Sequence, residues 1–432
     1  MEKIIHEIIQ EFHQTKLPSL IKRDLKIPAN LRKIFVIYGL RRAGKTYYLF
    51  QLIQKFLNKG YAKKQIFYLN FEDERLAKIT TKDLSKIVEL YYQLNPRIKN
   101  PIFFFDEIQE VACWEKFTRR LLEKAQAKIF LTGSSSKLLS REIATSLRGR
   151  TLSYQLFPLS LKEFIRIKNI SLPKVLTEKE KARIKRLLKQ YLRYGAYPEV
   201  ANFARREKMK TLQEYLDLII YRDLIERFDI KRLSILKLLL QSLVESFAKE
   251  FSALKYCNFL KSQGRKISKN TIYSYFDALE EVSFFFSLRK YSAKLRVIEG
   301  SLPKVYLTDL GYATLFGKKD LGRRMENVVA LELRRIREYK DILLKSFYYK
   351  SADGKEVDFI ITKASNVHQL IQVCADLSNF TTKEREVKAL LKASKELKCN
   401  NLLIITQDEE GEEKIKGQKI KYTPLWKWLL EI

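Results

Sequence analysis

The feature that most constrains this chain is a glycine-rich loop near its start, with the spacing G-x-x-x-x-G-K-T. The loop reads Gly39-Leu40-Arg41-Arg42-Ala43-Gly44-Lys45-Thr46. The apolar stretch 33–38 before it predicts a strand, and the stretch after it, to residue 57, has apolar residues at helical spacing. Glycines let the backbone wrap an anion, and the following helix points its first N–H groups at the same place. The sequence therefore predicts a phosphate-binding loop between a strand and a helix, in a domain of the α/β class.

Side chains of this loop and of the positions that follow it have predicted roles in binding ATP and Mg²⁺. Lys45 would reach the β- and γ-phosphates, and Thr46 would place its hydroxyl on the metal. The full predicted nucleotide-binding set is Gly39, Leu40, Arg41, Arg42, Ala43, Gly44, Lys45, Thr46 and Tyr47, joined by Asp106, Thr132 and Ser134.

A second motif lies downstream, where the apolar run 102–105 ends in two carboxylates, Asp106 and Glu107. A carboxylate at the end of such a strand binds Mg²⁺ through water, and a second one can polarise the attacking water. The alternative, a core strand that ends in two solvated acids, fits poorly beside Lys45. We therefore expect an ATP hydrolase in which Thr46 and Asp106 hold the metal and Glu107 and Lys45 are catalytic.

Two further groups of polar residues extend the predicted site. Thr132 and Ser134 end the predicted strand 128–131 and could orient the water, although a turn of small polar residues explains them equally well. Arg148 and Arg150 flank a glycine, and an arginine delivered to a neighbour's nucleotide would stabilise transition-state charge. That catalytic role would require a homo-oligomer. A structural salt bridge or a DNA phosphate contact is an equally good interpretation of either arginine.

The pattern of predicted elements divides the 432 residues into four parts. Strands alternate with helices in the first part, which predicts a parallel sheet covered on both faces. The parts are an α/β ATPase core at 1–165, a helical lid at 166–245, a winged helix at 246–300 and a second α/β domain at 301–432.

Positive charge dominates the chain, with 83 Lys and Arg against 50 Asp and Glu, a formal net charge of +33. Such an excess favours a polyanionic partner, and double-stranded DNA is the one we expect. The plain alternative is that solvated helix faces are simply basic. The residues around the predicted recognition helix that we expect to contact DNA are Lys261, Arg265, Lys266, Lys269 and Thr271. The same unit could instead only bridge its neighbouring domains.

Other residue types narrow the possibilities. The four cysteines lie far apart without C-x-x-C spacing, which argues against a zinc site or a disulfide framework. Apolar runs stay below the ~20 residues that a membrane-spanning helix needs, and the N-terminus lacks a signal-type apolar segment. We expect a cytoplasmic protein without a membrane partner.

Together these motifs resemble the AAA+ class of ATPases. More narrowly, the chain resembles a large prokaryotic and archaeal family in which an AAA+ module precedes a winged helix and a restriction-endonuclease-like domain of the PD-(D/E)xK type. Stretches typical of that family, beyond the phosphate loop, are Asp106-Glu107-Ile108-Gln109, 131–135, 146–150, 194–199, Arg222-Asp223, Glu326-Asn327 and 356–359. The resemblance implies ATPase activity and assembly.

The endonuclease-like resemblance also implies a metal site. This sequence differs from the residue pattern of that site. Glu326 and Asp358 match the acidic positions, but the E-x-K position reads Gln372-Val373-Cys374 and lacks the lysine. We therefore expect an inactive nuclease domain, unless Lys350 or Lys355 supplies the charge from another strand. An ATP-gated protein-binding switch with little hydrolysis, or an ATP-dependent nuclease, are the alternative functions.

Overall fold

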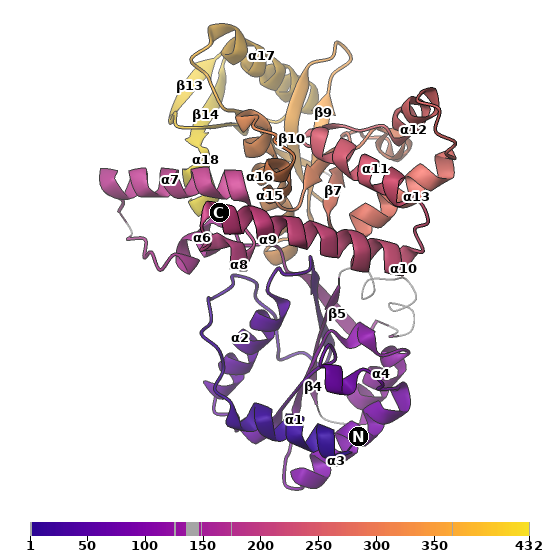
Figure 1. The fold of residues 1–432 in the computed structure, drawn as a ribbon. Helices are drawn as coiled ribbons and strands as arrows, with labels where there is room; N and C mark the ends of the chain where they lie inside the picture. Colours follow the sequence, from indigo (N-terminus) through magenta and orange to yellow (C-terminus); the bar gives the residue numbers. More distant parts are fainter. Residues whose placement is uncertain are drawn as a thin grey trace. The chain divides into compact units, whose positions relative to one another are not determined.

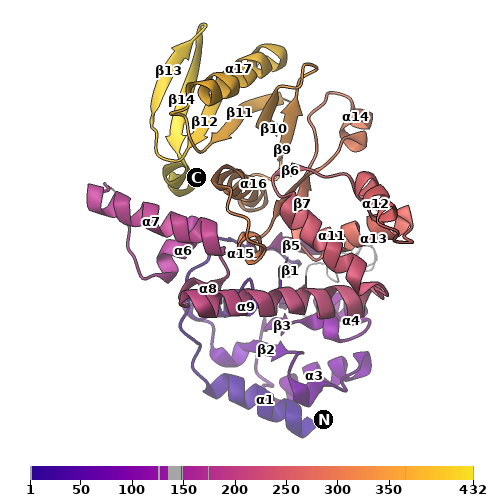
Figure 2. The same cartoon turned by 45° about the horizontal axis from the view of Figure 1, so that its top comes forward.

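The computed structural model describes residues 2–124, 127–134, 147, 149–173, 175–364 and 366–431. The chain forms two compact units, residues 1–157 and residues 158–432 (Figure 1). Figures 1 and 2 label the elements where there is room, and each unit is described by itself.

Unit 1 is built on one sheet of five parallel strands in the order β2-β3-β4-β1-β5. The strands are β1 Ile34–Gly39, β2 Ile66–Asn70, β3 Ile102–Asp106, β4 Lys128–Ser134 and β5 Thr151–Gln155. All five residues of β3 are buried, because helices cover both faces of the sheet. The prediction of a parallel α/β sheet is thus confirmed. In this strand order β4 lies between β1 and β3, so its end lies between the phosphate loop and Asp106.

Alternate residues of these strands pack against different helices. Odd-numbered β3 residues such as Phe103 and Phe105 join the core that contains α1, α3 and α4. Phe104 instead stacks on Phe130 and meets Phe56 of α2 edge-on. This follows from the two-residue period of a strand. Among the described residues of unit 1 the helices are α1 Glu2–Gln14, α2 Lys45–Leu57, α3 Thr81–Leu94 and α4 Trp114–Lys124, with 3₁₀ turns at Lys63–Gln65, Glu74–Leu76 and Ile108–Glu110.

Unit 2 begins with helices. They are α6 Leu161–Ile167, α7 Glu178–Tyr194, α8 Pro198–Ala201, α9 Arg205–Leu218, a π-helical stretch Ile219–Ile225, α10 Glu226–Phe228 and α11 Leu233–Glu245. A small antiparallel sheet of order β6-β8-β7 follows with its own helices. Its elements are β6 Lys249–Glu250, α12 Ala253–Ser262, α13 Lys269–Glu281, β7 Phe285–Leu288, α14 Leu295–Gly300 and β8 Lys304–Leu307.

The last part of unit 2 carries a mixed six-stranded sheet of order β13-β14-β12-β11-β10-β9 (Figure 2). The strands β11, β12 and β14 are parallel, while β9, β10 and β13 pair antiparallel with their neighbours. α17 packs on β10 and β11, and α16 packs on β9 and β11. Bounds are α15 Gly311–Leu315, α16 Leu321–Tyr339, β9 Leu344–Lys350, β10 Glu356–Lys363, β11 Asn366–Cys374, α17 Phe380–Leu397, β12 Leu402–Thr406, β13 Gly411–Ile415, β14 Gln418–Pro424 and α18 Leu425–Glu431.

A buried aspartate connects two segments of unit 2 that are far apart in sequence. The Asp309 carboxylate accepts hydrogen bonds from the backbone N–H of Ala196 and of Gly311, both at 2.7 Å. Gly195 has φ +76°, and a Cβ there would lie 1.7 Å from the Asp309 carboxylate. Only glycine fits this turn, because a side chain would displace the carboxylate that holds it.

The described helices include none that is both long and apolar enough to cross a bilayer.

Candidate functional site

The loop between β1 and α2 has the bent backbone that its glycines allow. Gly39 has φ +155°, and a Cβ there would lie 2.2 Å from the carbonyl oxygen of Leu156. Gly44 is left-handed, with φ +94° and ψ +31°, and it is the N-cap of α2. Arg42 is also left-handed, with φ +66°. The loop therefore passes close to the end of β5 and turns directly into the helix.

Lys45, the first residue of α2, points back under the loop. It is 5% exposed, its Nζ lies 3.4 Å from the carbonyl oxygen of Gly39, and the same Nζ lies 3.3 Å from Oε1 of Glu107. The ammonium thus joins the loop to the end of β3.

Asp106 ends β3 and is fully buried among hydroxyl groups. Its Oδ2 accepts a hydrogen bond from the Tyr68 hydroxyl at 3.0 Å, its Oδ1 accepts one from Thr132, and Thr46 also hydrogen-bonds this carboxylate. Burial and the neighbouring Glu107 charge raise the pKa of Asp106, against the lowering effect of the three hydroxyl donors. A cation beside this carboxylate would relieve its desolvation.

Glu107 follows in a left-handed conformation with φ +51°. Its backbone N–H donates to Oγ1 of Thr132 at 3.0 Å, and its Oε2 accepts from Nε2 of Gln109 at 2.6 Å. Burial would raise the pKa of Glu107, but Lys45 and the Gln109 hydrogen bond together hold it below its ordinary value. The left-handed backbone costs about 1–3 kcal/mol for such a residue, and the surrounding contacts hold it in place.

Thr132 connects the two acids. Its side chain donates to Asp106 and accepts from the backbone of Glu107, and it is completely buried. This arrangement follows from the strand order, because β4 is hydrogen-bonded to both β1 and β3. Ser134, also in the predicted set, is the last residue of β4.

Three other predicted residues of unit 1 have the following surroundings. Arg41 pairs with Glu72 at 3.1 Å, and Tyr47 is 57% exposed. Arg150 pairs with Glu123 at 2.8 Å. Arg148 lies outside the described residues.

Three residues outside the predicted site set also hold this site together. Tyr68 contacts Asp106, Gln109 contacts Glu107, and Arg23 supports the loop from beneath. The Arg23 guanidinium is 6% exposed and donates to the carbonyl oxygens of Ala43 at 2.8 Å and Phe157 at 2.5 Å. Gln109 ends a stretch that the family resemblance points to, but no role was predicted for it. Tyr68 and Arg23 are polar residues outside any predicted motif, which is too common a pattern to single out.

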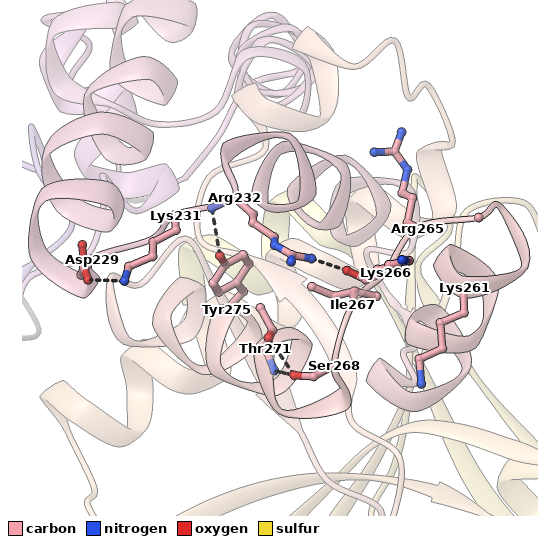
Figure 3. Close-up of a pocket in the computed structure, with 11 residues that line it drawn as sticks. Asp229, Lys231, Arg232, Lys261, Arg265, Lys266, Ile267, Ser268, Thr271 and Tyr275 are labelled. Atoms are coloured by element: carbon pink, nitrogen blue, oxygen red, sulfur yellow. Dashed lines mark hydrogen bonds and ion pairs between the residues drawn. The ribbon is translucent and has the colours of Figure 1, made fainter.

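A second candidate site is a cationic pocket in unit 2, between the end of α12, the start of α13 and the segment before α11 (Figure 3). The pocket has a volume of about 810 Å³. It is lined by Asp229, Lys231, Arg232, Lys261, Gly264, Arg265, Lys266, Ile267, Ser268, Thr271 and Tyr275. We call it the basic pocket, because five of these side chains are cationic and one is acidic.

Four of the five predicted DNA-contacting residues line the basic pocket. Ser268 caps α13 there, with its Oγ accepting from the Thr271 N–H at 3.1 Å. Arg232 donates to the carbonyl oxygen of Lys266 (Figure 3). The fifth predicted residue, Lys269, does not line the pocket, and its ammonium lies 5.6 Å from the ring centre of Tyr273.

The residues that the endonuclease-like resemblance indicates also lie together. Glu326, Asp358 and Gln372 line one cavity of about 700 Å³. Cys374 is buried, and its Sγ donates to the carbonyl oxygen of Asp376 at 3.3 Å.

The two lysines suggested as substitutes for the missing one pair with other acids. Lys350 lies 3.0 Å from Glu250, and Lys355 lies 3.6 Å from Asp353. A different lysine, Lys304, contacts Glu326 and Asp358.

Models of known families match three successive parts of the chain. An AAA domain matches residues 31–165. Two domains of unknown function, DUF8612 and DUF4143, match residues 185–321 and 321–428.

Similar proteins extend over nearly the whole chain. The uncharacterized protein MJ1544 of Methanocaldococcus jannaschii is 41% identical over 439 residues, covering 99% of this chain and 96% of that protein. An uncharacterized protein of Haemophilus influenzae is 30% identical over 397 residues, covering 91% of this chain and 94% of its own. Among solved structures, a Walker-type ATPase of Pyrococcus abyssi aligns over 73% of this chain and 94% of its own, with 16% identity and a TM-score of 0.43, too low to compare the folds in detail. The chain belongs to the same family as the uncharacterized proteins of M. jannaschii and H. influenzae, and its residues 31–165 match the model of an AAA domain.

Proposed function

We propose that the chain is an ATPase that binds ATP with Mg²⁺ at the loop of unit 1, hydrolyses it and couples hydrolysis to a rearrangement on double-stranded DNA. The observation that carries the proposal is the convergence of Lys45, Asp106, Glu107 and Thr132 at the ends of β1, β3 and β4. A cluster with only a structural role needs no bent glycine loop beside it. A phosphate site needs both the cluster and the loop.

The lysine-glutamate pair suggests how binding prepares the reaction. In this structure the Lys45 ammonium is paired with Glu107. The β- and γ-phosphates of ATP would attract that ammonium and leave Glu107 to bind the attacking water. Gln109 and Thr132 would keep the glutamate in place, because each holds it by a hydrogen bond that does not involve the lysine.

The residues fit a magnesium ion. Thr46 and Asp106 hydrogen-bond each other at the start of α2 and the end of β3, and both are oxygen ligands of the kind that Mg²⁺ prefers. The carboxylate is buried, and burial raises its pKa, so a cation there would be favoured. When bound, the metal would neutralise charge on the phosphates.

Several observations support a DNA partner. The elements α11, β6, α12, α13, β7 and β8, with sheet order β6-β8-β7, follow the order of a winged helix. The basic pocket lies at the start of α13, where phosphate oxygens could meet both the cations and the helix N-terminus. The net charge of +33 also favours binding to DNA.

The order α16, β9, β10, β11, α17, β12 supports an endonuclease-like C-terminal domain. Without a lysine at the position of Cys374, this domain would not cleave DNA. The proposal also includes assembly into a homo-oligomer. In such an assembly Arg148 or Arg150 would reach the nucleotide of a neighbouring subunit.

ATP turnover with and without double-stranded DNA tests the proposal. Lys45→Ala should abolish Mg²⁺-dependent turnover. Lys55→Ala, which changes an exposed lysine on the same helix, is the matched control and should not. DNA should stimulate the wild-type rate. Turnover that survives Lys45→Ala would rule out the assignment of the site, and ATP binding without turnover would favour a binding switch.

The DNA contact is tested separately by the salt dependence of binding. Replacing Lys261, Arg265 and Lys266 by alanine should reduce the slope of log K against log salt by about 0.9 for each phosphate that is no longer neutralised. The control removes three exposed lysines from the β13–β14 hairpin, Lys414, Lys416 and Lys421. Equal weakening of DNA binding in both variants would mean that only net charge matters.

A further inference from the structure

Lys304, a residue that no motif singled out, is the centre of the acidic cluster in unit 2. It lies at the start of β8 and is 3% exposed. Its Nζ lies 3.0 Å from Oε1 of Glu326, 2.5 Å from Oε1 of Glu356 and 3.6 Å from Oδ1 of Asp358. Carboxylates from α16 and β10 therefore converge on one ammonium from a third element.

Two oxygens of the cluster also accept hydrogen bonds from other protein groups. Glu326 Oε1 also accepts from the Tyr306 hydroxyl at 2.8 Å. Asp358 Oδ2 accepts from the backbone N–H of Val373 at 2.9 Å. These hydrogen bonds hold Glu326 and Asp358 in the orientation in which both contact Lys304.

Gln372, which stands at the first position of the E-x-K pattern, also makes hydrogen bonds within the protein. Its Oε1 accepts from the backbone N–H of Asp358 at 3.2 Å, and its Nε2 donates to Glu386 Oε2 at 2.5 Å. The amide oxygen is thus used within the sheet, and the amide nitrogen carries protons that would repel a metal.

A divalent ion bound by Glu326 and Asp358 would have to lie within about 2.0–2.6 Å of an oxygen of each. The ammonium already occupies the space between those oxygens, and two cations so close in a buried site repel each other strongly. Consistently, no group of three acidic, thiol or imidazole side chains in the described part of the chain is arranged to hold a metal.

We propose that Lys304 is the permanent cation of this cluster, taking the place of the divalent metal that an endonuclease-like site would bind. The side chain pairs with Glu326, Glu356 and Asp358 and links β8 to α16 and β10. The missing lysine at Cys374 is therefore not the main obstacle to metal-dependent cleavage. The ammonium of Lys304 is already paired with the carboxylates that such a metal would bind. This inference deepens the proposed lack of nuclease activity and does not depend on ATP hydrolysis.

Binding of Mn²⁺, measured by the decrease of its free electron paramagnetic resonance signal, tests the proposal on the full chain without nucleotide. All variants carry Asp106→Asn, which removes the metal carboxylate of the ATP site. With Lys304 intact, we expect the cluster to bind no Mn²⁺. Glu326→Gln and Asp358→Asn should therefore leave the amount of bound Mn²⁺ unchanged. Adding Lys304→Met should create one Mn²⁺ site, at least about tenfold tighter than any residual binding, since a buried like charge is gone. Glu326→Gln should abolish that new site.

Two results would overturn the proposal. In the first, the Lys304-containing protein binds Mn²⁺ and Glu326→Gln abolishes this binding. The cluster would then be a working metal site. The second is a folded Lys304→Met protein, with an unchanged circular dichroism spectrum, that gains no Mn²⁺. If Lys304→Met does not fold, the comparison of the Lys304-containing protein with its Glu326→Gln variant still decides. That comparison uses no ATP, so its failure is distinct from failure of the ATPase assignment.

Discussion

Replacing Arg23 by methionine removes a buried guanidinium from beneath the phosphate loop while keeping most of the side-chain volume. The substitution removes the hydrogen bonds to the carbonyl oxygens of Ala43 at 2.8 Å and Phe157 at 2.5 Å. Hydrogen bonds from a charged group contribute about 1.5–3 kcal/mol each. The desolvation of the charge offsets part of their sum, so we expect the unfolding free energy of unit 1 to fall by about 3 kcal/mol.

Chemical denaturation followed by tryptophan fluorescence measures this change. Trp114 is buried in unit 1, and the other two tryptophans, Trp426 and Trp428, lie in unit 2 and can be replaced by phenylalanine. Arg32→Met is the matched control. That arginine is exposed and donates a long hydrogen bond of 3.3 Å to the carbonyl oxygen of Leu122, so its replacement should cost less than about 0.5 kcal/mol. Equal effects of the two substitutions would refute the role given to Arg23.

Three further predictions concern single residues. Thr132→Val removes the hydroxyl that links Asp106 to the backbone of Glu107. The substitution should lower kcat about 10–100-fold while a fluorescent ATP analogue still binds. An unchanged kcat would contradict the role of Thr132. Gly195→Ala places a Cβ 1.7 Å from Asp309 and should lower the unfolding free energy of unit 2 by more than about 2 kcal/mol; a neutral effect in urea denaturation would contradict the turn geometry. Burial raises the pKa of Asp309 to about 7, so folded unit 2 keeps a proton that the unfolded chain releases above about pH 4. Its contribution to stability is therefore complete below about pH 4 and is lost as pH rises toward 7, and denaturation across this range should show a steeper decline in wild type than in Asp309→Asn.

Local pattern was enough to predict the parallel sheet and the bent loop of unit 1. Asp106 follows an apolar run, and Thr132 ends another, so both were expected at the carboxyl edge of a parallel sheet. Their direct hydrogen bond depends on strand order, however, because β4 must lie beside β3. Spacing along the chain does not carry that information.

The residues missed from the sequence act through contacts between distant segments. Arg23 reaches a carbonyl 134 residues away, and Lys304 meets Glu326 on a helix and Asp358 on a strand that follow it. From the sequence, Lys350 or Lys355 was the expected substitute for the missing nuclease lysine. The lysine that does contact the acids comes from β8, which precedes all of those elements.

The central claim is that Glu107 activates water for ATP hydrolysis. Its most direct test is single-turnover hydrolysis of ATP by Glu107→Gln beside wild type, with ATP binding measured on the same samples. The amide keeps the shape and the Gln109 contact but is not a base, so we expect ATP binding within a few-fold of wild type and hydrolysis slowed by at least about 100-fold. Hydrolysis by Glu107→Gln at the wild-type rate would contradict the account.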